Sequence, residues 1–140
     1  GFSRFSSDIQ QTTEKALVDK QKQLLEMLSL VDDAEKVLTS KTDLNEFGRL
    51  LDYTWKLKRG ISSRISTGSI DDLYAKGIEA GALGGKLLGA GGGGFLLFYV
   101  EPDKQESVHK AMEELLYVPF EFENSGTRVI HYTPETYEKR

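Results

Sequence analysis

Apolar residues recur every three or four positions along the first 80 residues, the spacing that aligns side chains on one face of a helix. Ser7 followed by Gln10 predicts a helix start, and the polar run Thr39 to Thr42 predicts where that helix ends. A second helix is predicted between Asp43 and Gly60, since a glycine often follows a helix end. A third helix is predicted to start at Ser69, after the turn that begins at Thr67. The residues expected on the buried faces are Ile9, Ala16, Leu17, Leu24, Leu28, Val31 and Leu38 in the first helix, Leu44, Phe47, Leu51 and Trp55 in the second, and Ile70, Leu73, Tyr74 and Ile78 in the third.

The second half of the chain has short apolar runs between turn residues, a pattern that predicts strands. Lys86 to Leu88 predicts a short strand, and Phe95 to Val100 a fully buried one. Pro102 predicts the first turn of a fourth helix. Phe120 to Glu123 and Arg128 to Tyr132 predict two last strands. The fourth helix is expected to bury Val108, Met112 and Leu115, and the last two strands to be joined by the turn Asn124-Ser125-Gly126.

The order of these elements predicts the fold class. Strands joined by short turns pair antiparallel, and helices must cover the sheet to bury its apolar side. Residues 1–140 are therefore expected to form one α+β domain with two layers, a four-stranded antiparallel sheet and helices packed on it.

Residues 81–94 hold eight of the chain's fourteen glycines, and this run joins two segments that are expected to be buried. Ordering glycine costs conformational entropy, so such a run inside a core element indicates a backbone that another group approaches closely. Phosphate is a common ligand of consecutive backbone N–H groups. No Gly-Lys-Ser/Thr follows the run and no helix follows it directly, so it is neither a P-loop nor a dinucleotide fingerprint. A hairpin turn, or tight packing of a helix on the sheet, is the alternative interpretation.

Composition narrows the function classes. The net charge of −4 argues against nucleic acid as a partner, and the absence of cysteine excludes disulfides, cysteine zinc sites and a thiol nucleophile. No apolar run reaches the eighteen residues or so that span a membrane, and the sequence has no signal-peptide pattern at its start. We expect a cytoplasmic domain.

One stretch of the second helix and beyond is uniformly basic. Between Asp52 and Asp71 the chain carries four cations and no acid. This cluster is either a solvated helix end or a cationic wall for a phosphorylated substrate. Trp55 beside it is either core or a wall of the substrate cleft. The four cations are Lys56, Lys58, Arg59 and Arg64.

No self-contained catalytic group or metal site is expected. His109 is predicted on the polar side of a helix and His131 on a sheet surface, and neither has a second ligand at metal spacing. Asp32-Asp33 and Asp71-Asp72 are neighbours along a helix, so their side chains diverge.

Lys86, two residues and then Gly89 to Gly94 before a hydrophobic run resemble the third signature motif of the GHMP kinases, which include galactokinase, homoserine, mevalonate and phosphomevalonate kinases. Further residues look like the branch that acts on D-glycero-D-manno-heptose 7-phosphate. They are Ser3-Arg4-Phe5-Ser6, Leu50-Leu51, Trp55-Lys56-Leu57-Lys58, Ser62-Ser63, Ile65-Ser66, Pro119-Phe120 and Gly126-Thr127-Arg128-Val129.

This resemblance implies the C-terminal domain of an ATP-dependent sugar kinase, with a four-stranded, ferredoxin-like sheet. The family's N-terminal domain, which carries the ATP-binding loop, the catalytic acid and most contacts to ATP and Mg²⁺, is not in these residues and would be the main partner. The chain alone is therefore expected to be inactive. The resemblance places one set of residues at the ATP and substrate cleft: Lys86, Gly89, Ala90, Gly91, Gly92, Gly93 and Gly94.

The substrate implied by the resemblance is the anomeric hydroxyl of heptose 7-phosphate, in the synthesis of cell-surface polysaccharide. The candidates for its phosphate are Lys58, Arg59 and Arg64, with Trp55 nearby. A fucose- or galactose-type kinase is one alternative. A non-enzymatic α+β module for ligand binding or dimerisation is another.

Overall fold

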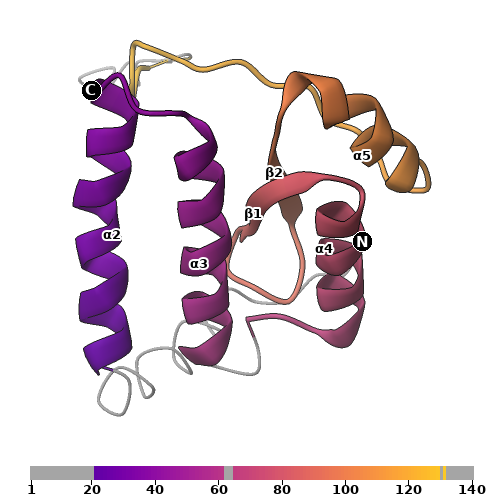
Figure 1. The fold of residues 1–140 in the computed structure, drawn as a ribbon, viewed down its shortest axis with the longest axis horizontal. Helices are drawn as coiled ribbons and strands as arrows, with labels where there is room; N and C mark the ends of the chain where they lie inside the picture. Colours follow the sequence, from indigo (N-terminus) through magenta and orange to yellow (C-terminus); the bar gives the residue numbers. More distant parts are fainter. Residues whose placement is uncertain (1–20, 62–64, 130, 132–140) are drawn as a thin grey trace, which may run out of the picture.

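The computed structural model describes residues 21–61, 65–129 and 131 of the chain. Three helices are followed by a hairpin of two strands, then by a short 3-10 turn and one more helix (Figure 1). The elements are α2 (Gln21–Thr39), α3 (Asn45–Ile61), α4 (Gly68–Glu79), β1 (Ala82–Leu88), β2 (Phe95–Val100), η1 (Pro102–Lys104) and α5 (Gln105–Ala111).

The hairpin lies between α3 and α4, and α2 packs on the far side of α3 (Figure 1). β1 and β2 pair antiparallel, with Lys86 opposite Leu97 and Leu88 opposite Phe95. β1 starts at Ala82, four residues earlier than predicted, because Gly84 and Gly85 belong to the strand. The α+β class and the antiparallel pairing of these two strands are confirmed.

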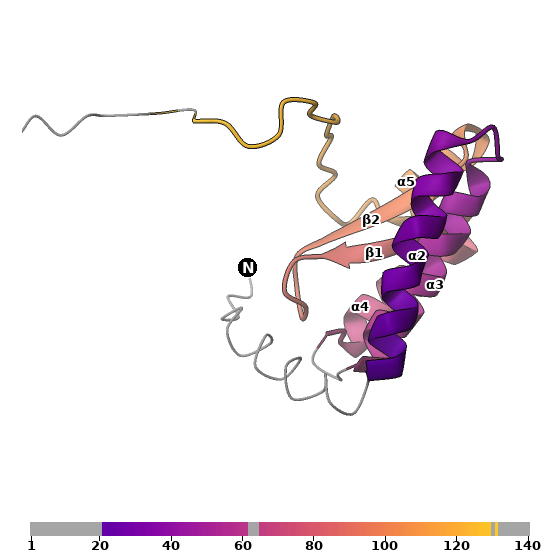
Figure 2. The same cartoon turned by 90° about the vertical axis from the view of Figure 1, so that its left-hand side faces the viewer.

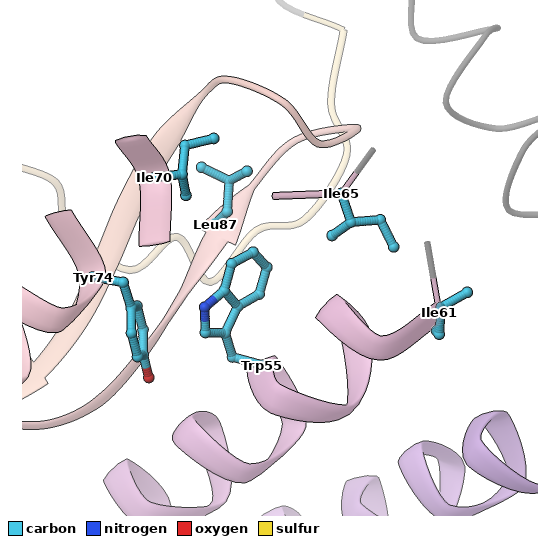
Figure 3. Packing of buried hydrophobic residues seen from close by; sticks show 6 residues of the cluster. All are labelled: Trp55, Ile61, Ile65, Ile70, Tyr74 and Leu87. Atoms are coloured by element: carbon cyan, nitrogen blue, oxygen red, sulfur yellow. The ribbon is translucent and has the colours of Figure 1, made fainter. Parts of the chain in front are cut away.

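The buried core joins α3, α4 and β1 (Figure 3). Trp55 is only 1% exposed, and its indole lies among side chains from all three elements. Its ring centroid is 6.0 Å from that of Tyr74, which is 5.6 Å from that of Phe98 on β2. The cluster consists of Trp55, Ile61, Ile65, Ile70, Tyr74 and Leu87.

Two glycines set how closely β1 approaches α3. A side chain at Gly84 would overlap the backbone carbonyl of Gly48, and a side chain at Gly48 would press on Leu83 and Tyr99. Part of the glycine run is therefore a packing feature, as the alternative interpretation held. The contact fixes β1 against the helix that carries the basic cluster.

Helix α2 buries only part of the predicted face, on which Leu24 is confirmed. Leu28, Val31 and Leu38 are 66%, 60% and 57% exposed, whereas Leu24 and Met27 pack against the core. The predicted stripe mixed residues from two adjacent faces, and three- and four-residue spacings alone do not say which face meets α3. The predicted start at Ser7, with Ile9, Ala16 and Leu17, lies outside the described residues.

Two helix ends also differ from the sequence prediction. Gly60 lies inside α3, not after it, and its missing side chain leaves room for the Gln23 amide. That amide donates to the carbonyl of Leu57 at 3.0 Å and ties α2 to α3. Helix α4 starts at Gly68 with Thr67 as its N-cap, one residue earlier than predicted.

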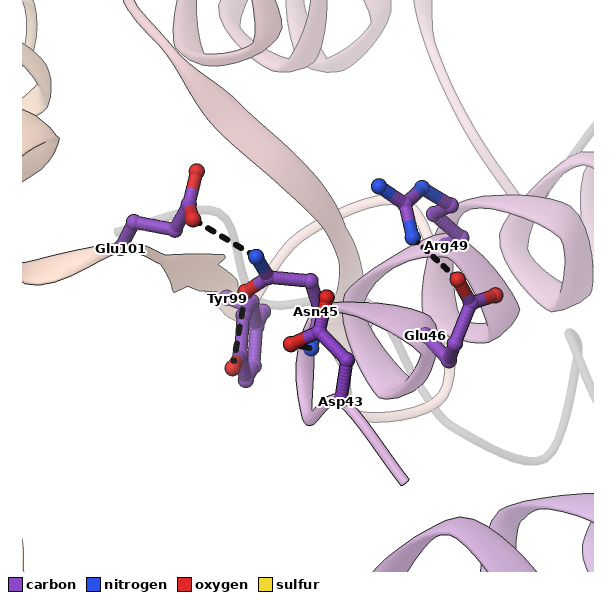
Figure 4. Close-up of polar contacts among 6 residues, drawn as sticks. All are labelled: Asp43, Asn45, Glu46, Arg49, Tyr99 and Glu101. Atoms are coloured by element: carbon purple, nitrogen blue, oxygen red, sulfur yellow. Dashed lines mark hydrogen bonds and ion pairs between the residues drawn. The ribbon is translucent and has the colours of Figure 1, made fainter.

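A polar network holds the start of α3 to the end of β2 (Figure 4). The backbone N–H of Asn45 donates to Asp43 Oδ1 at 3.1 Å, so the Asp43 carboxylate caps the start of α3. The Asn45 amide donates to Glu101 Oε1 at 2.6 Å and accepts from the Tyr99 hydroxyl at 3.3 Å. Arg49 pairs with Glu46 one turn later.

The prediction of a four-stranded sheet was wrong for the C-terminal part of the described chain. Within the described residues the sheet has two strands, and residues 116–129 contain no strand or helix. This segment leads away from the hairpin (Figure 2), with Phe120 63% and Phe122 92% exposed. Alternating apolar and polar residues form a strand only where a neighbouring strand satisfies their backbone groups, and no described strand pairs with residues 116–129.

The fourth predicted helix is also shorter than expected. Its first turn is the 3-10 turn η1 and its α-helical part ends at Ala111. Val108 is buried as predicted, Met112 is half-buried, and Leu115 is 43% exposed.

Candidate functional site

Gly89 to Gly94 form the connection between β1 and β2, so the loop is a hairpin turn as the alternative interpretation held. Four glycines of the loop have φ between 68° and 133°, a region that residues other than glycine rarely adopt. They are Gly89, Gly91, Gly92 and Gly94. The N–H of Gly92 donates to the carbonyl of Ile65 at 3.0 Å, which fixes the loop to the segment after α3.

The outer side of this loop is open. A side chain at Gly93 would meet no heavy atom of the described chain within 4 Å, and the φ of Gly93 lies outside the left-handed region. At the base of the loop Leu88 and Phe95 face each other across the strands, 39% and 61% exposed. The loop thus offers free backbone beside an apolar rim, and another group or domain can approach it.

The four cations of the basic cluster differ in whether a carboxylate pairs with them. Lys56 pairs with Asp52 at 2.6 Å and Arg59 pairs with Asp71 at 3.0 Å. The two acids that bound the acid-free stretch therefore neutralise two of its cations. Arg64 lies outside the described residues. In the described part of the chain, Lys58 has no ion pair.

Lys58 instead lies close enough to Lys86 for the charge of Lys86 to act on it. Lys58 is half-buried on α3 and Lys86 half-buried on β1. Burial lowers the pKa of Lys58, and the positive charge of Lys86 lowers it further. We call Lys58 and Lys86 the lysine pair. Spacing along the sequence gave no sign of their proximity, which depends on the close approach of β1 to α3.

Trp55 is a core residue and not a wall of a cleft, which corrects one of the two interpretations left open. Its side chain is buried among apolar neighbours. Its indole N–H has no hydrogen-bond partner among the described residues. An indole in this environment stabilises the fold and does not contact a ligand from solution.

A pocket of about 290 Å³ opens between α3 and α4. The Tyr74 hydroxyl donates to Asp52 Oδ1 there at 2.9 Å. Burial raises the pKa of Tyr74 well above its ordinary value, and the bond to Asp52 raises it further. The Asp52 carboxylate is thus shared by Tyr74 and Lys56, so one of the two acids that line the pocket is already satisfied. The lining residues are Asp52, Lys56, Arg59, Tyr74, Ala75, Ile78, Glu79 and Leu83.

No metal site is found among the described residues, where no three His, Asp or Glu side chains come together. His109 is exposed, with its ring 4.2 Å from that of Tyr117 between centroids. Within the same part of the chain, no helix has the length and apolar composition needed to cross a membrane.

Known proteins similar to this chain are kinases. Residues 30–118 match the family model described as GHMP kinases C terminal. The chain is 32% identical over 131 residues to the D-glycero-alpha-D-manno-heptose 7-phosphate kinase of Campylobacter jejuni, a match covering 91% of the chain and 38% of that relative. It is 36% identical over 89 residues to the mevalonate kinase of Pyrococcus abyssi, covering 62% of the chain and 26% of that relative.

A solved structure shares the fold. The crystal structure of L. major mevalonate kinase in complex with R-mevalonate matches with a TM-score of 0.67 at 23% identity, over 81% of this chain and 36% of that one. The chain spans under two fifths of the length of the relatives it matches, since the largest share is 38%.

Proposed function

Because the chain belongs to the GHMP kinases, whose C-terminal family model matches residues 30–118, we propose that it is the C-terminal domain of an ATP-dependent kinase acting on D-glycero-D-manno-heptose 7-phosphate. The proposed reaction transfers a phosphoryl group to the anomeric hydroxyl. The observation that carries the choice of substrate is the extent of similarity: the match to the heptose 7-phosphate kinase covers 91% of the chain, against 62% for the mevalonate kinase.

The glycine loop has a defined task in this proposal. Phosphoryl transfer depends on positioning and on stabilising charge that develops on phosphate oxygens. The backbone N–H at Gly93, where no described atom lies within 4 Å of the position of a side chain, can approach an anion or another backbone closely. The exposed Leu88 and Phe95 at the loop base support the same arrangement, since exposed apolar side chains favour contact with a neighbouring domain.

ATP and Mg²⁺ are proposed as the nucleotide substrate and its metal. The metal would neutralise charge on the transferring phosphate. Carboxylates suited to Mg²⁺ do not gather among the described residues, so we propose that an N-terminal kinase domain, the main partner of this one, holds the metal and most of the nucleotide. This chain's own contribution would be the glycine loop and the lysine pair.

The test is an acceptor panel with the complete protein that contains this chain. Heptose 7-phosphate, galactose, fucose and mevalonate are each supplied with MgATP, and ³¹P NMR identifies the phosphorylated position. We expect kcat/KM for heptose 7-phosphate to exceed that for the other acceptors at least about a hundredfold, because a site that pairs with a charged group rejects acceptors lacking it.

Two outcomes of this panel contradict the proposal. Preferred turnover of galactose, fucose or mevalonate would place the protein in another branch of the same family. Absence of turnover with every acceptor, from a folded protein, would favour the non-enzymatic module.

A further inference from the structure

The lysine pair is produced by the packing of β1 on α3. Gly84 on β1 lies against Gly48 and Asp52 of α3, and Lys86 is two residues, or about 6.6 Å, further along the strand. Lys58 is three residues after buried Trp55, so the two share the face of α3 turned toward β1. Helix side chains tilt toward the N-terminus, which brings the Lys58 side chain back toward Lys86.

No anion of the described chain completes this pair. The neighbouring cations Lys56 and Arg59 each have a carboxylate within 3.0 Å. Lys58 and Lys86 have none among the described residues, although both are half-buried. Bringing two ammonium groups together away from water is unfavourable, as the lowered pKa of Lys58 reflects. Such an arrangement is typical of a binding site in which the ligand supplies the counter-charge.

The positive charge of the lysine pair indicates which kind of anion it would bind. A phosphate monoester carries close to two negative charges at neutral pH, since its second pKa is about 6. Two ammonium groups match that charge, whereas a carboxylate would leave one cation uncompensated. The position agrees with this, because only Leu87 and Leu88 separate Lys86 from the glycine loop.

We propose that the lysine pair binds the phosphate group that the acceptor sugar already carries. This inference rests on the proposed function and adds to it the residues that recognise the substrate. The other source of phosphate is ATP, whose charge Mg²⁺ already offsets in part. The acceptor's monoester has no metal and depends on protein cations.

The experiment uses the complete kinase with Lys58→Met, Lys86→Met and the double variant. Methionine keeps the apolar stem and removes the charge. Lys56→Met is the matched control, because Lys56 is two residues away on the same helix and is paired with Asp52. We expect each pair variant to raise KM for heptose 7-phosphate roughly ten- to a hundredfold, the usual effect of a lost charge-assisted bond. KM for ATP should stay within about twofold, Lys58→Arg should restore part of the loss, and Lys56→Met should change neither KM.

Three results would overturn the inference. One is an unchanged KM for the sugar phosphate in both single variants. Another is a raised KM for ATP in place of the acceptor, which would make the pair a nucleotide site. The third is an equal loss in the Lys56→Met control, which would mean a general effect of surface charge.

A binding measurement separates this inference from the proposed function. Calorimetric titration of heptose 7-phosphate without ATP reports on the pair whether or not turnover occurs. If the wild-type protein binds the sugar phosphate and the pair variants do not, the inference stands even when no phosphorylation is found. If turnover is normal and the variants bind as wild type, the inference fails while the proposed function stands.

Discussion

Replacing Gly93 tests whether glycine at this position is needed for activity or for the backbone conformation of the loop. The φ of Gly93 lies outside the left-handed region, and a side chain there would meet no described atom within 4 Å. Gly93→Ala should therefore leave the free energy of unfolding unchanged, or raise it by about 0.4–1 kcal/mol. If phosphates or a second domain approach the loop, the added methyl group should lower kcat/KM of the complete kinase roughly a hundredfold, through misplacement of the reacting groups.

Gly68→Ala is the matched control for this variant. Gly68 also has open space where a side chain would be added, but it lies at the start of α4 and outside the loop. Its replacement should leave kcat/KM unchanged and, as at Gly93, leave the free energy of unfolding unchanged or raise it by about 0.4–1 kcal/mol. Full activity of Gly93→Ala would show that the glycine loop is only a turn.

We expect Lys58 to lower the free energy of unfolding, although it contributes to the proposed binding of phosphate. The pKa of Lys58 is lowered in the folded chain, so its protonated form is less favourable in the folded state than in the unfolded state. Lys58→Met should therefore raise the free energy of unfolding at pH 7 by roughly 0.5 kcal/mol, a value reduced for screening by water. The gain should vanish above pH 10.5, the ordinary pKa, where the side chain is neutral in both states.

Urea unfolding at pH 7 and pH 11 measures this effect. Lys56→Met, which removes the partner of Asp52, should not stabilise the fold at pH 7. A destabilised Lys58→Met would mean that Lys58 has an anionic neighbour in the fold, against the ligand-site interpretation.

The sequence indicated the residue types of the candidate site but not how they pair. Lys86, the glycine loop and the basic cluster all stand out in the sequence, yet Lys58 and Arg59 look equivalent there. Their difference depends on Asp71, which lies on α4 and reaches Arg59 only in the folded chain. Trp55 was ambiguous for the same reason, because its burial depends on Tyr74 and Leu87 from other elements.

At the scale of elements, Tyr74 joins α4 to α3 and β1. Its hydroxyl donates to Asp52 Oδ1, and the ring packs on Trp55 and Phe98. The pKa of Tyr74 is raised above its ordinary 10.0 in the folded state. Its contribution to stability is therefore complete below pH 10 and is lost as the pH rises above that value.

Tyr74→Phe tests this contribution. It should cost about 1 kcal/mol at pH 8, the usual net value of such a hydrogen bond, and the difference from wild type should shrink by pH 12. Unfolding by urea at several pH values gives both numbers, and Tyr117→Phe, an exposed ring, is the control. A difference that is constant from pH 8 to pH 12 would mean that the hydroxyl titrates as in the unfolded chain.

Helices and strands with a clear pattern in their own residues were predicted well. Strands that form only beside a neighbouring strand or helix were not. The positions of α3, α4, β2 and the described part of the first helix follow from periodicity and apolar runs. The prediction that β2 is fully buried was wrong, because Phe95 is 61% exposed and the rest of the strand is half-buried. The strands expected at Phe120 to Glu123 and from Arg128 onward rested on alternation alone, and the described residues there are not in a strand. β1 was predicted too short because glycine is rare in strands, whereas here Gly84 is required by the contact with Gly48.

The molecule as a whole presents its candidate site at one end of the hairpin, where the described chain leaves the loop open. The chain spans 38% of the heptose 7-phosphate kinase it resembles. Its candidate groups are backbone amides and two ammonium groups, which bind anions but do not take a proton from a sugar hydroxyl at neutral pH. We therefore expect the isolated 140-residue chain to show no ATP-dependent phosphorylation of heptose 7-phosphate, while the complete protein turns it over.

Circular dichroism must first establish that the isolated chain is folded, so that inactivity is not a result of unfolding. A sensitive assay then compares the chain alone, the remainder of the protein alone, and the two mixed. Activity that returns only on mixing would support a site shared between two domains, since each supplies a group that the other lacks. Turnover by the chain alone, abolished by Lys58→Met but not by Lys56→Met, would place the catalytic groups within these 140 residues and overturn the two-domain proposal.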